Sequence, residues 1–582
     1  DDGSVNDRYY SYMVERAKGG FGMVMMEVSS IAEKGYCIAH EPALWDDKFL
    51  PGLTRLADGV HHYGGKICAQ LHHAGREAID ENVKPIAPSA IKAMTAASSI
   101  IPTNLPREMT NAEVWELIEL FGDAALRCKK AGIDCVEVHG AHQYLIAQFT
   151  SPYANKRTDE FGGTFERRMR FPLEVVKNIR KKCGDDYPIL YRLSGDERVM
   201  GGRTIHHSQL VARYMQDVAG VDAIHVSVGT TSSAIAMVAP SNFPEGHLLD
   251  DAMKIKEAVT VPVIAVGRMH EPHFIEMALE MGWADAISVG RQSIADPFFP
   301  NKIATGRTDE ICRCISCQQG CIGRLNDPNY LAIYCLMNPF VARDHIWRVE
   351  EAEVKKKIVV IGGGPAGLQF AWMAAQRGHK VVVFEKEDRL GGQVNLAMFP
   401  PSRDTFGSSI IYWETMCKKY GVDIRLNTEA TLATIRTEEP DTVIVATGAL
   451  PVCPPFKGLN AHEVANAWDV LSGSTPVGYK AIVIGGGLVG CETADYLAHQ
   501  GHKVTIVEMM PTLAGDMVQW ENAELLRRLT EQCTFRTGAK VVEILADGVL
   551  IEVDGKYEHL TGYDSVIVAC GAAPYNPFEG ML

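Results

Sequence analysis

Two histidines and a tyrosine lie close together in the segment His139-Gly-Ala-His142-Gln-Tyr144. The two imidazoles are three residues apart, so both rings can converge on one oxygen atom. Hydrogen bonds from them to a carbonyl oxygen would stabilise the enolate that forms when hydride adds to an electron-poor carbon–carbon double bond. The phenol of Tyr144 can supply the accompanying proton, because an enolate carbon is a strong base. These three side chains could therefore combine oxyanion stabilisation with proton transfer at a carbonyl compound.

Four cysteines further along the chain have the spacing C-x2-C-x3-C-x13-C, at Cys314, Cys317, Cys321 and Cys335. Tight spacing lets one loop supply three thiolates, and a more distant fourth thiolate closes the site, as in four-iron clusters. A structural zinc site is the alternative, but zinc ribbons usually combine two C-x2-C pairs and this segment has one. The spacing favours a 4Fe-4S cluster. We interpret the nearby Cys312 as a bystander.

Two glycine-rich segments, residues 362–367 and 485–490, each follow an apolar run and have the pattern G-x-G-x-x-G. In each case a second apolar run ends at a glutamate. Glycines allow the close approach of a pyrophosphate to a helix N-terminus, and the acidic residue can hold a ribose. We expect two dinucleotide sites formed by an internal duplication, with the second copy inserted into the first domain. The residues predicted from this pattern are Gly362, Gly364, Gly367, Glu385, Gly485, Gly487, Gly490 and Glu508, and Gly392 and Gln393 are added by resemblance to the FAD-binding segment of disulfide-reductase-type flavoproteins.

The second of these sites is expected to bind a nicotinamide cofactor. Glu508 would bond the ribose hydroxyls and repel a 2′-phosphate, so NADH is favoured over NADPH. His502 and Lys503 keep NADPH as the alternative, because both lie nearby in the sequence.

Upstream of the cysteines, short apolar runs alternate with helical patterns, which predicts an α/β fold with a parallel sheet. A (β/α)8 TIM barrel that lacks its first strand fits this alternation best, and a doubly wound sheet is the alternative. The expected strands are residues 23–26, 66–70, 135–139, 189–193, 223–227, 263–266 and 286–289, and clear helical patterns cover residues 111–131, 166–182 and 273–281.

In a barrel the chemistry lies at the carboxyl ends of the strands. The expected strand ends carry polar groups such as Gln70, Arg192 and His225. The last two ends carry the Gly-Arg pairs 267–268 and 290–291. Glycine lets the backbone approach a phosphate and arginine adds charge-assisted hydrogen bonds, so these pairs predict a phosphate site.

The barrel segment resembles the Old Yellow Enzyme family of flavin reductases in residues 9–10, 16–20, 70–76, 139–145, 151–152, 155–163 and 166–168. The resemblance implies FMN in the barrel mouth, with Gln70 and Arg192 facing the flavin ring and ribityl chain. It also implies that His139 and His142 bind the substrate carbonyl and that Tyr144 delivers the proton. The residues expected to hold the FMN phosphate are Gly267, Arg268, Gly290 and Arg291.

Over its whole length the chain resembles the 2,4-dienoyl-CoA reductase and clostridial 2-enoate reductase group. Residues 389–393 and 443–448 resemble the FAD-binding motifs of disulfide-reductase-type flavoproteins. The resemblance implies electron flow from NADH through FAD and a 4Fe-4S cluster to FMN. Amine oxidation of the trimethylamine dehydrogenase type is the alternative, and a non-catalytic zinc-stapled scaffold is an alternative from another class. The sequence leaves open which enoate, dienoyl-CoA, flavonoid or steroid enone is reduced, and the pocket loop 230–246 is expected to shape that choice.

The net charge of the chain bears on the class of molecule that it binds. The 582 residues have a formal net charge of −15, which argues against a nucleic-acid partner. We expect a small unsaturated carbonyl substrate, no membrane partner and a cytoplasmic location, and a homo-oligomer stays open. The predicted divisions are a barrel at 1–307, a cluster segment at 308–354, an FAD part at 355–451, an NAD(P)H domain at 452–577 and an FAD-domain return beginning at 578–582. We also expect the chain to be incomplete at both ends and, expressed alone, to bind FMN and FAD poorly and to aggregate.

Overall fold

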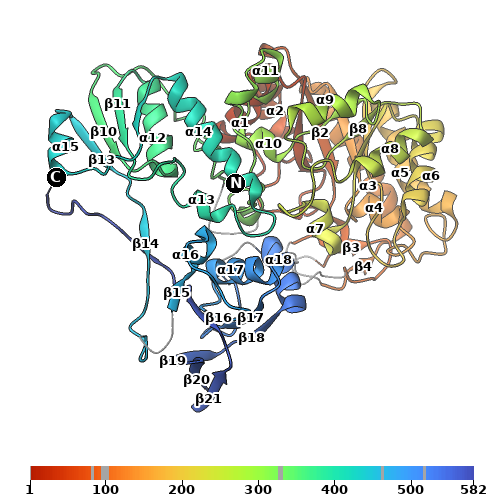
Figure 1. Cartoon of the computed structure of the whole chain (residues 1–582). Helices are drawn as coiled ribbons and strands as arrows, with labels where there is room; N and C mark the ends of the chain where they lie inside the picture. Colours follow the sequence, from red (N-terminus) through yellow and green to blue (C-terminus); the bar gives the residue numbers. More distant parts are fainter. Residues whose placement is uncertain are drawn as a thin grey trace. The chain divides into compact units, whose positions relative to one another are not determined.

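The computed structural model describes residues 2–79, 84–93, 104–325, 332–459, 464–515 and 519–581 (Figure 1). The chain divides into two compact units, one formed by residues 1–314 and 318–347 and the other by residues 315–317 and 348–582. Within the described ranges, every helix falls short of the length or the apolar character that a membrane crossing needs.

The first unit is built on a parallel sheet whose strands lie side by side in chain order. A doubly wound sheet would reverse its strand order at a switch point, so that alternative is wrong. The two edge strands of this sheet are not paired with each other within the described residues. The strands are β1 (Met23–Ser30), β2 (Lys66–His72), β5 (Cys135–Gly140), β6 (Ile189–Ser194), β7 (Ala223–Ser227), β8 (Val263–Ala265) and β9 (Ala286–Ile287).

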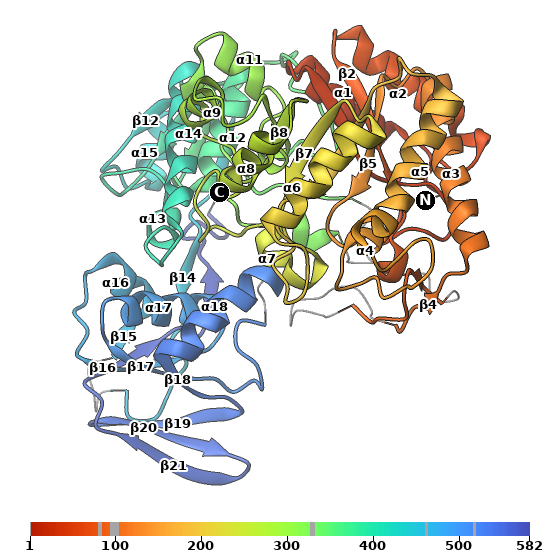
Figure 2. The ribbon, with the colours of Figure 1, turned by 90° about the vertical axis from the view of Figure 1, so that its right-hand side faces the viewer.

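Helices between these strands form an outer layer, in which neighbours along the chain pack on one another. Figure 2 shows α3, α5 and α6 (orange to yellow) in front of the strands they connect. Sequential parallel strands inside a ring of helices are the predicted barrel architecture, which is confirmed. The helices are α1 (Asp7–Lys18), α2 (Leu50–His62), α3 (Asn111–Lys130), α5 (Phe165–Cys183), α6 (Ile205–Tyr214), α8 (Leu249–Ala258) and α9 (Pro272–Glu280).

Local sequence accounts for these boundaries. Thr110 caps α3 in a reciprocal capping box with Glu113, and Leu117 and Phe121 lie on the buried face of the same helix. Strand β2 is buried from its second residue to its end, as expected for a strand covered on both faces. Strand β1 is longer than the predicted run at 23–26, because it continues as far as Ser30.

The second unit contains two parallel sheets of the same design. In each sheet, the strand before the glycine-rich loop has two neighbours. One is the next strand along the chain, which a glutamate follows, and the other is a strand from much later in the chain. This shared order agrees with the predicted internal duplication. The first sheet has β12 (Asp423–Arg425), β11 (Lys380–Phe384), β10 (Lys357–Ile361) and β13 (Thr442–Val445), and the second has β15 (Val464–Asn466), β22 (Ser565–Val568), β16 (Lys480–Ile484), β17 (Lys503–Val507) and β18 (Cys533–Arg536).

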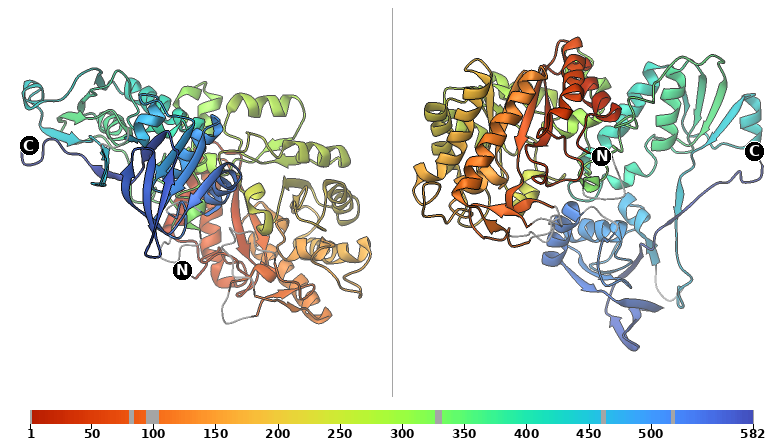
Figure 3. Two further views of the ribbon diagram at one scale, coloured as in Figure 1. Left: turned by 60° about the horizontal axis from the view of Figure 1, so that its bottom comes forward. Right: turned by 180° about the vertical axis from the view of Figure 1, so that it is seen from behind.

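Each of these sheets carries a helix directly after its glycine-rich loop, α12 (Pro365–Gln376) in the first and α17 (Leu488–His499) in the second. In the second fold, α17 and α18 (Gln519–Gln532) pack on one face of the sheet. A small antiparallel sheet, dark blue in Figure 3, packs on the other face. Its strands are β19 (Ala539–Leu545), β20 (Gly548–Val553) and β21 (Lys556–Thr561).

Two short strands link the ends of the two nucleotide folds. β14 (Ala449–Pro451) follows the first sheet, β23 (Ala572–Pro574) follows the second, and they pair antiparallel. The pairing lies near the predicted division at residue 452.

Candidate active site

Four aromatic rings gather at the carboxyl ends of β2 and β5. The ring centroids of His139 and His142 are 5.1 Å apart, and that of Tyr144 is 5.0 Å from that of His139. His72, the last residue of β2, lies 4.4 Å from Tyr144. All four side chains are buried. The three predicted catalytic residues are therefore brought together, and a fourth ring joins them.

The hydrogen bond of His139 fixes which of its ring nitrogens is free to donate. Nδ1 of His139 accepts the backbone N–H of Ala141 at 3.3 Å. The ring proton of neutral His139 therefore lies on Nε2, which can donate to a substrate oxygen. Nε2 of His142 lies 2.9 Å from the hydroxyl oxygen of Ser227. The backbone N–H of His142 donates to the hydroxyl oxygen of Ser194 at 3.0 Å.

Both histidines are neutral at ordinary pH. Burial, together with the neighbouring His142 ring and Arg192, holds the pKa of His139 well below its usual value. Burial and Arg192 do the same to the pKa of His142. A neutral imidazole still carries one N–H, so each ring can stabilise a developing oxyanion without first losing a proton.

Tyr144 caps the start of α4 (Leu145–Thr150) and is held in its protonated form. Burial raises its pKa well above the ordinary value, and the Cys37 thiol, with which its hydroxyl hydrogen-bonds, raises it further. Glu41, which lies beside Cys37, has its own pKa raised by burial to about 8. The phenol is thus a proton donor over the whole physiological pH range.

A chain of polar side chains crosses the barrel interior below these rings. The Gln70 amide donates to Glu137, whose other oxygen accepts from Nδ1 of His225 at 2.7 Å. Nε2 of His225 then accepts from Nη1 of Arg192 at 2.9 Å. Burial favours a raised pKa for Glu137, but His225 and Arg192 outweigh it and the pKa is lowered. Glu137 is therefore a buried carboxylate that orients Gln70 and, through His225, Arg192.

Arg192 has a further donor that these contacts leave unused. Its Nε is buried and has no hydrogen-bond partner among the described residues. An unpaired buried donor at the barrel mouth fits a polar cofactor such as the predicted flavin.

The predicted phosphate residues end two paired strands. Gly267 and Arg268 follow β8, and Gly290 and Arg291 follow β9. Nη1 of Arg291 is buried with no partner among the described residues. The pKa of His247 is lowered to about 4 by burial and by the charges of Arg291 and Arg268, so both cationic groups act on this one ring. A concentration of positive charge with an unpaired donor fits a phosphate group.

Three of the predicted cluster cysteines lie near one another in the first unit. Burial raises the pKa of the Cys335 thiol to about 11, and the neighbouring Cys314 and Cys321 thiols add to the shift. The Cys312 thiol is also buried beside Cys314 and Cys335, and it lies 3.6 Å from the carbonyl oxygen of Met337. Cys317 follows Cys314 by three residues. The donor chemistry fits iron–sulfur coordination.

The two glycine-rich loops have matching geometry. A Cβ on Gly367 would lie 2.0 Å from the Gly362 carbonyl oxygen, and a Cβ on Gly490 would lie 1.9 Å from that of Gly485. Only glycine allows α12 and α17 to pack this closely on their loops. Gly364 and Gly487 are the N-caps of those helices.

The predicted ribose-binding glutamates also bond their own loops. Oε2 of Glu385 accepts the N–H of Gly363 at 2.7 Å, and Oε2 of Glu508 accepts the N–H of Gly486 at 2.5 Å. Lys503 begins β17 whereas Glu508 directly follows its end, so Lys503 lies at the far end of this strand. Next to it, Nδ1 of His502 bonds the Gly478 carbonyl at 2.9 Å. The two basic residues that favoured NADPH therefore lie away from Glu508.

Gly392 and Gln393 lie next to the first glycine-rich loop, residues 362–367. A Cβ on Gly392 would lie 3.1 Å from the Cα of Gly364, and Nε2 of Gln393 donates to the carbonyl of Ala449 at 3.3 Å. The predicted FAD residues 362–367, 385, 392 and 393 thus border one glycine-rich loop.

Comparisons with known proteins match these two units. Residues 1–310 match the NADH:flavin oxidoreductase / NADH oxidase family, and residues 356–580 match the pyridine nucleotide-disulphide oxidoreductase family. The chain belongs to the NADH:flavin oxidoreductase / NADH oxidase family. The predicted resemblance to Old Yellow Enzyme-like flavin oxidoreductases is confirmed. Both families support FMN, FAD and NADH as cofactors.

Several members of this family are similar over nearly the whole chain. An NADH oxidase from Thermoanaerobacter brockii is 43% identical over 99% of this chain and 88% of that protein. A cinnamate reductase from Clostridium sporogenes is 36% identical over 98% of this chain and 88% of that protein. A solved 2-naphthoyl-CoA reductase complex has 33% identity and a TM-score of 0.93, covering 98% of this chain and 88% of that one.

Several residues that contact the predicted site residues of this NADH:flavin oxidoreductase were not predicted from the sequence. Cys37, Glu41 and Glu137 lie outside the recognisable motifs, and Ser227 is an ordinary residue at a strand end. The only signal available was the position of Glu137 two residues before His139 on one strand, which points both side chains to the same face.

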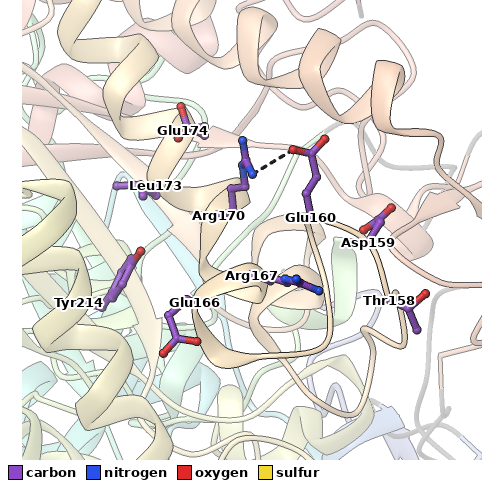
Figure 4. A pocket seen from close by; sticks show the side chains of 9 residues that line it. All are labelled: Thr158, Asp159, Glu160, Glu166, Arg167, Arg170, Leu173, Glu174 and Tyr214. Carbon is purple, nitrogen blue, oxygen red and sulfur yellow. Dashed lines mark ion pairs between the residues drawn. The ribbon is translucent and has the colours of Figure 1, made fainter.

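The open depression in Figure 4 contains none of the predicted site residues. It has a volume of about 620 Å³ and lies over α5 and the loop before it. An ion pair between Arg170 and Glu160, at 3.0 Å, crosses it. Its lining is Thr158, Asp159, Glu160, Glu166, Arg167, Arg170, Leu173, Glu174 and Tyr214.

Proposed function

We propose that this enzyme uses NADH to reduce the activated carbon–carbon double bond of an unsaturated acyl compound, with FAD, a 4Fe-4S cluster and FMN as its electron carriers. The observation that carries the proposal is the cluster of His139, His142 and Tyr144 at the carboxyl ends of the barrel strands. When bound, FMN supplies hydride to one carbon of the double bond. The protein residues supply the rest of the chemistry.

His139 donates from Nε2 to the carbonyl oxygen of the substrate, and His142 contributes a second neutral imidazole beside it. The negative charge that develops on this oxygen is stabilised by donors that are already oriented, so no reorganisation is needed during the reaction. Tyr144 transfers its proton to the second carbon. One hydride and one proton convert the C=C bond into a saturated CH–CH bond.

The cofactor assignments rest on side chains whose chemistry suits each group. Gln70, Arg192, Arg268 and Arg291 would hold FMN, whereas Glu385 and its loop would hold FAD. Cys314, Cys317, Cys321 and Cys335 would hold the 4Fe-4S cluster. The loop at 485–490 and Glu508 would bind NADH.

The substrate class is an acid or thioester whose double bond is conjugated to the carbonyl. Two of the relatives are named for cinnamate and 2-naphthoyl-CoA, which supports an aryl-conjugated acyl group. The loop 230–246 borders the site, because Thr230 bridges to His142 and Thr231 donates to Glu77 at 2.9 Å. This position supports its role in substrate choice.

Amine oxidation is the second candidate. It is less well supported, because the second nucleotide fold keeps an intact glycine loop and a glutamate beside it, as binding of NADH requires.

Anaerobic NADH oxidation by the iron- and flavin-loaded enzyme tests the proposal. We expect turnover with cinnamate or its CoA thioester and with other conjugated enoates, and the saturated product should appear in equal amount to the NADH consumed. Dimethylamine and trimethylamine should leave both flavins oxidised. Reduction of the flavins by an amine, without any turnover of enoates, would favour the second candidate.

A further inference from the structure

Three side chains with metal-binding atoms meet beside Tyr144, and the proposed reaction uses none of them. Cys37 and Glu41 come from the loop that follows β1, and His72 is the last residue of β2. The thiol sulfur, a carboxylate oxygen and an imidazole nitrogen all lie within 4.8 Å of one another. Within the described residues, this is the one such group of three or more His, Cys, Asp or Glu side chains.

The polar atoms of this group are deeply buried and poorly satisfied by the protein. His72 is 0% exposed and Glu41 is 7% exposed. Oε1 of Glu41 accepts two backbone N–H groups, from Cys37 at 2.8 Å and Ile38 at 2.9 Å. Oε2 of Glu41 and both ring nitrogens of His72 have no hydrogen-bond partner among the described residues.

The side chains of His72 and Glu41 do not satisfy each other by a hydrogen bond. Nε2 of His72 lies 3.9 Å from Oε1 of Glu41, which is too long for a hydrogen bond. Buried polar atoms are almost always paired in native proteins, and a bound ion is one of the ways they are satisfied.

We propose that Cys37, Glu41 and His72 bind one divalent cation with the ligand preference of zinc. Thiolate, imidazole and carboxylate are the three ligand types that zinc takes in proteins, and three protein ligands leave the fourth position to water. Magnesium and calcium prefer sets made only of oxygen atoms, so a set with sulfur and nitrogen disfavours them. This site is distinct from the cysteine segment 312–335.

The cation would add a side-chain link between two segments that backbone hydrogen bonds, such as that from Ala74 to Gly35 at 2.7 Å, already hold together. It would fix the loop carrying Cys37 and Glu41 to the end of β2. The hydroxyl group of Tyr144, which hydrogen-bonds Cys37, would then lie beside a metal-bound thiolate that holds the phenol in one orientation. Because coordination requires the Cys37 proton to leave, binding should release protons.

X-ray absorption at the zinc edge tests the proposal on the wild-type holoenzyme. The protein is first loaded with iron, incubated with an equimolar amount of zinc and dialysed against metal-free buffer. We expect retained zinc surrounded by one sulfur at about 2.3 Å and by nitrogen and oxygen at about 2.0–2.2 Å. Zinc surrounded by four sulfurs would place the ion in the cysteine segment and overturn the proposal, as would the absence of retained zinc.

Elemental analysis of variants gives a second, independent measurement. We expect Cys37→Ala and His72→Gln to lose the retained zinc, whereas Cys128→Ala, which removes another buried thiol from α3, should keep it. Circular dichroism and flavin content report whether each variant is folded. Zinc retained by folded Cys37→Ala at the wild-type level would overturn the proposal, and if a variant does not fold, the wild-type absorption spectrum decides.

Discussion

The Nε2 atom of His142 lies 2.9 Å from the hydroxyl oxygen of Ser227, although 85 residues separate the two in the chain. Ser227 is the last residue of β7, and Ser194, which accepts the backbone N–H of His142, is the last residue of β6. His142 itself follows β5 in a left-handed backbone conformation, with φ of 60°. The end of β7 thus contacts the imidazole of His142, and the end of β6 holds its backbone.

Ser227→Ala should lower kcat/KM for a conjugated enoate about 3- to 10-fold. The reason is that loss of one hydrogen bond, worth about 0.5–1.5 kcal/mol, frees the His142 ring from its orientation. Steady-state NADH oxidation measures the effect. Ser11→Ala, on the outer helix α1, is the control and should behave like the wild type. If both variants have the wild-type kcat/KM, Ser227 does not orient His142.

Tyr144→Phe should slow the reaction of reduced FMN with the enoate by about 10²–10⁴-fold, because only the proton donor is lost. Reduction of FMN by NADH should stay close to normal. Stopped-flow absorbance separates the two half-reactions. Tyr63→Phe, at an exposed position, is the matched control. A collapse of the NADH half-reaction in Tyr144→Phe would show that the phenol has another role.

Stability should fall as the pH drops below the ordinary histidine pKa of about 6.5. The pKa values of His139 and His142 are well below that value in the folded protein, so the unfolded chain binds protons first. Their contribution to stability is full above about pH 6.5 and is lost as the pH falls towards the folded pKa. The apparent thermal unfolding midpoint should therefore decrease from pH 7 to pH 5.5.

His139→Asn should reduce this pH dependence, whereas His206→Gln, on the exposed part of α6, should not. An equal pH dependence in wild type and His139→Asn would show that His139 is not a source of the effect.

Glu508→Ala should narrow or reverse the preference for NADH over NADPH, because the carboxylate that repels a 2′-phosphate is removed. The ratio of the two kcat/KM values measures this preference. Glu385→Ala is the matched variant, since Glu385 makes the same contact in the first nucleotide fold. Glu385→Ala should lower the amount of FAD that the protein binds. The ratio of kcat/KM for NADH to that for NADPH should stay unchanged. Wild-type selectivity in Glu508→Ala would place the recognition of the ribose elsewhere.

Cys317→Ala should lower the iron content and stop electrons from reaching FMN. Reduction of FAD by NADH, and of an artificial dye through FAD, should continue because neither needs the cysteine segment. Iron analysis and anaerobic absorbance spectra follow both effects. Cys453→Ala, at an exposed cysteine, is the control. Zinc in place of iron in the wild type, or normal enoate reduction by Cys317→Ala, would contradict the cluster assignment.

The sequence by itself determined every feature that depends on neighbours along the chain. The barrel strands, the helix at 111–131 and the two glycine loops follow from hydrophobic periodicity and from residues that only a tight turn requires. The grouping of His139, His142 and Tyr144 could be predicted for the same reason, because six consecutive residues of one strand end and its loop contain all three.

Only the tertiary structure decided which distant side chains meet these residues. Cys37 reaches Tyr144, Ser227 reaches His142 and His225 reaches Glu137, each across many residues of chain. Such contacts are set by the register of adjacent parallel strands and by the curvature of the sheet, which bring the carboxyl ends of separate strands to one mouth. The hydrophobic periodicity of the sequence does not specify that register, so these pairings could be identified only in the folded protein.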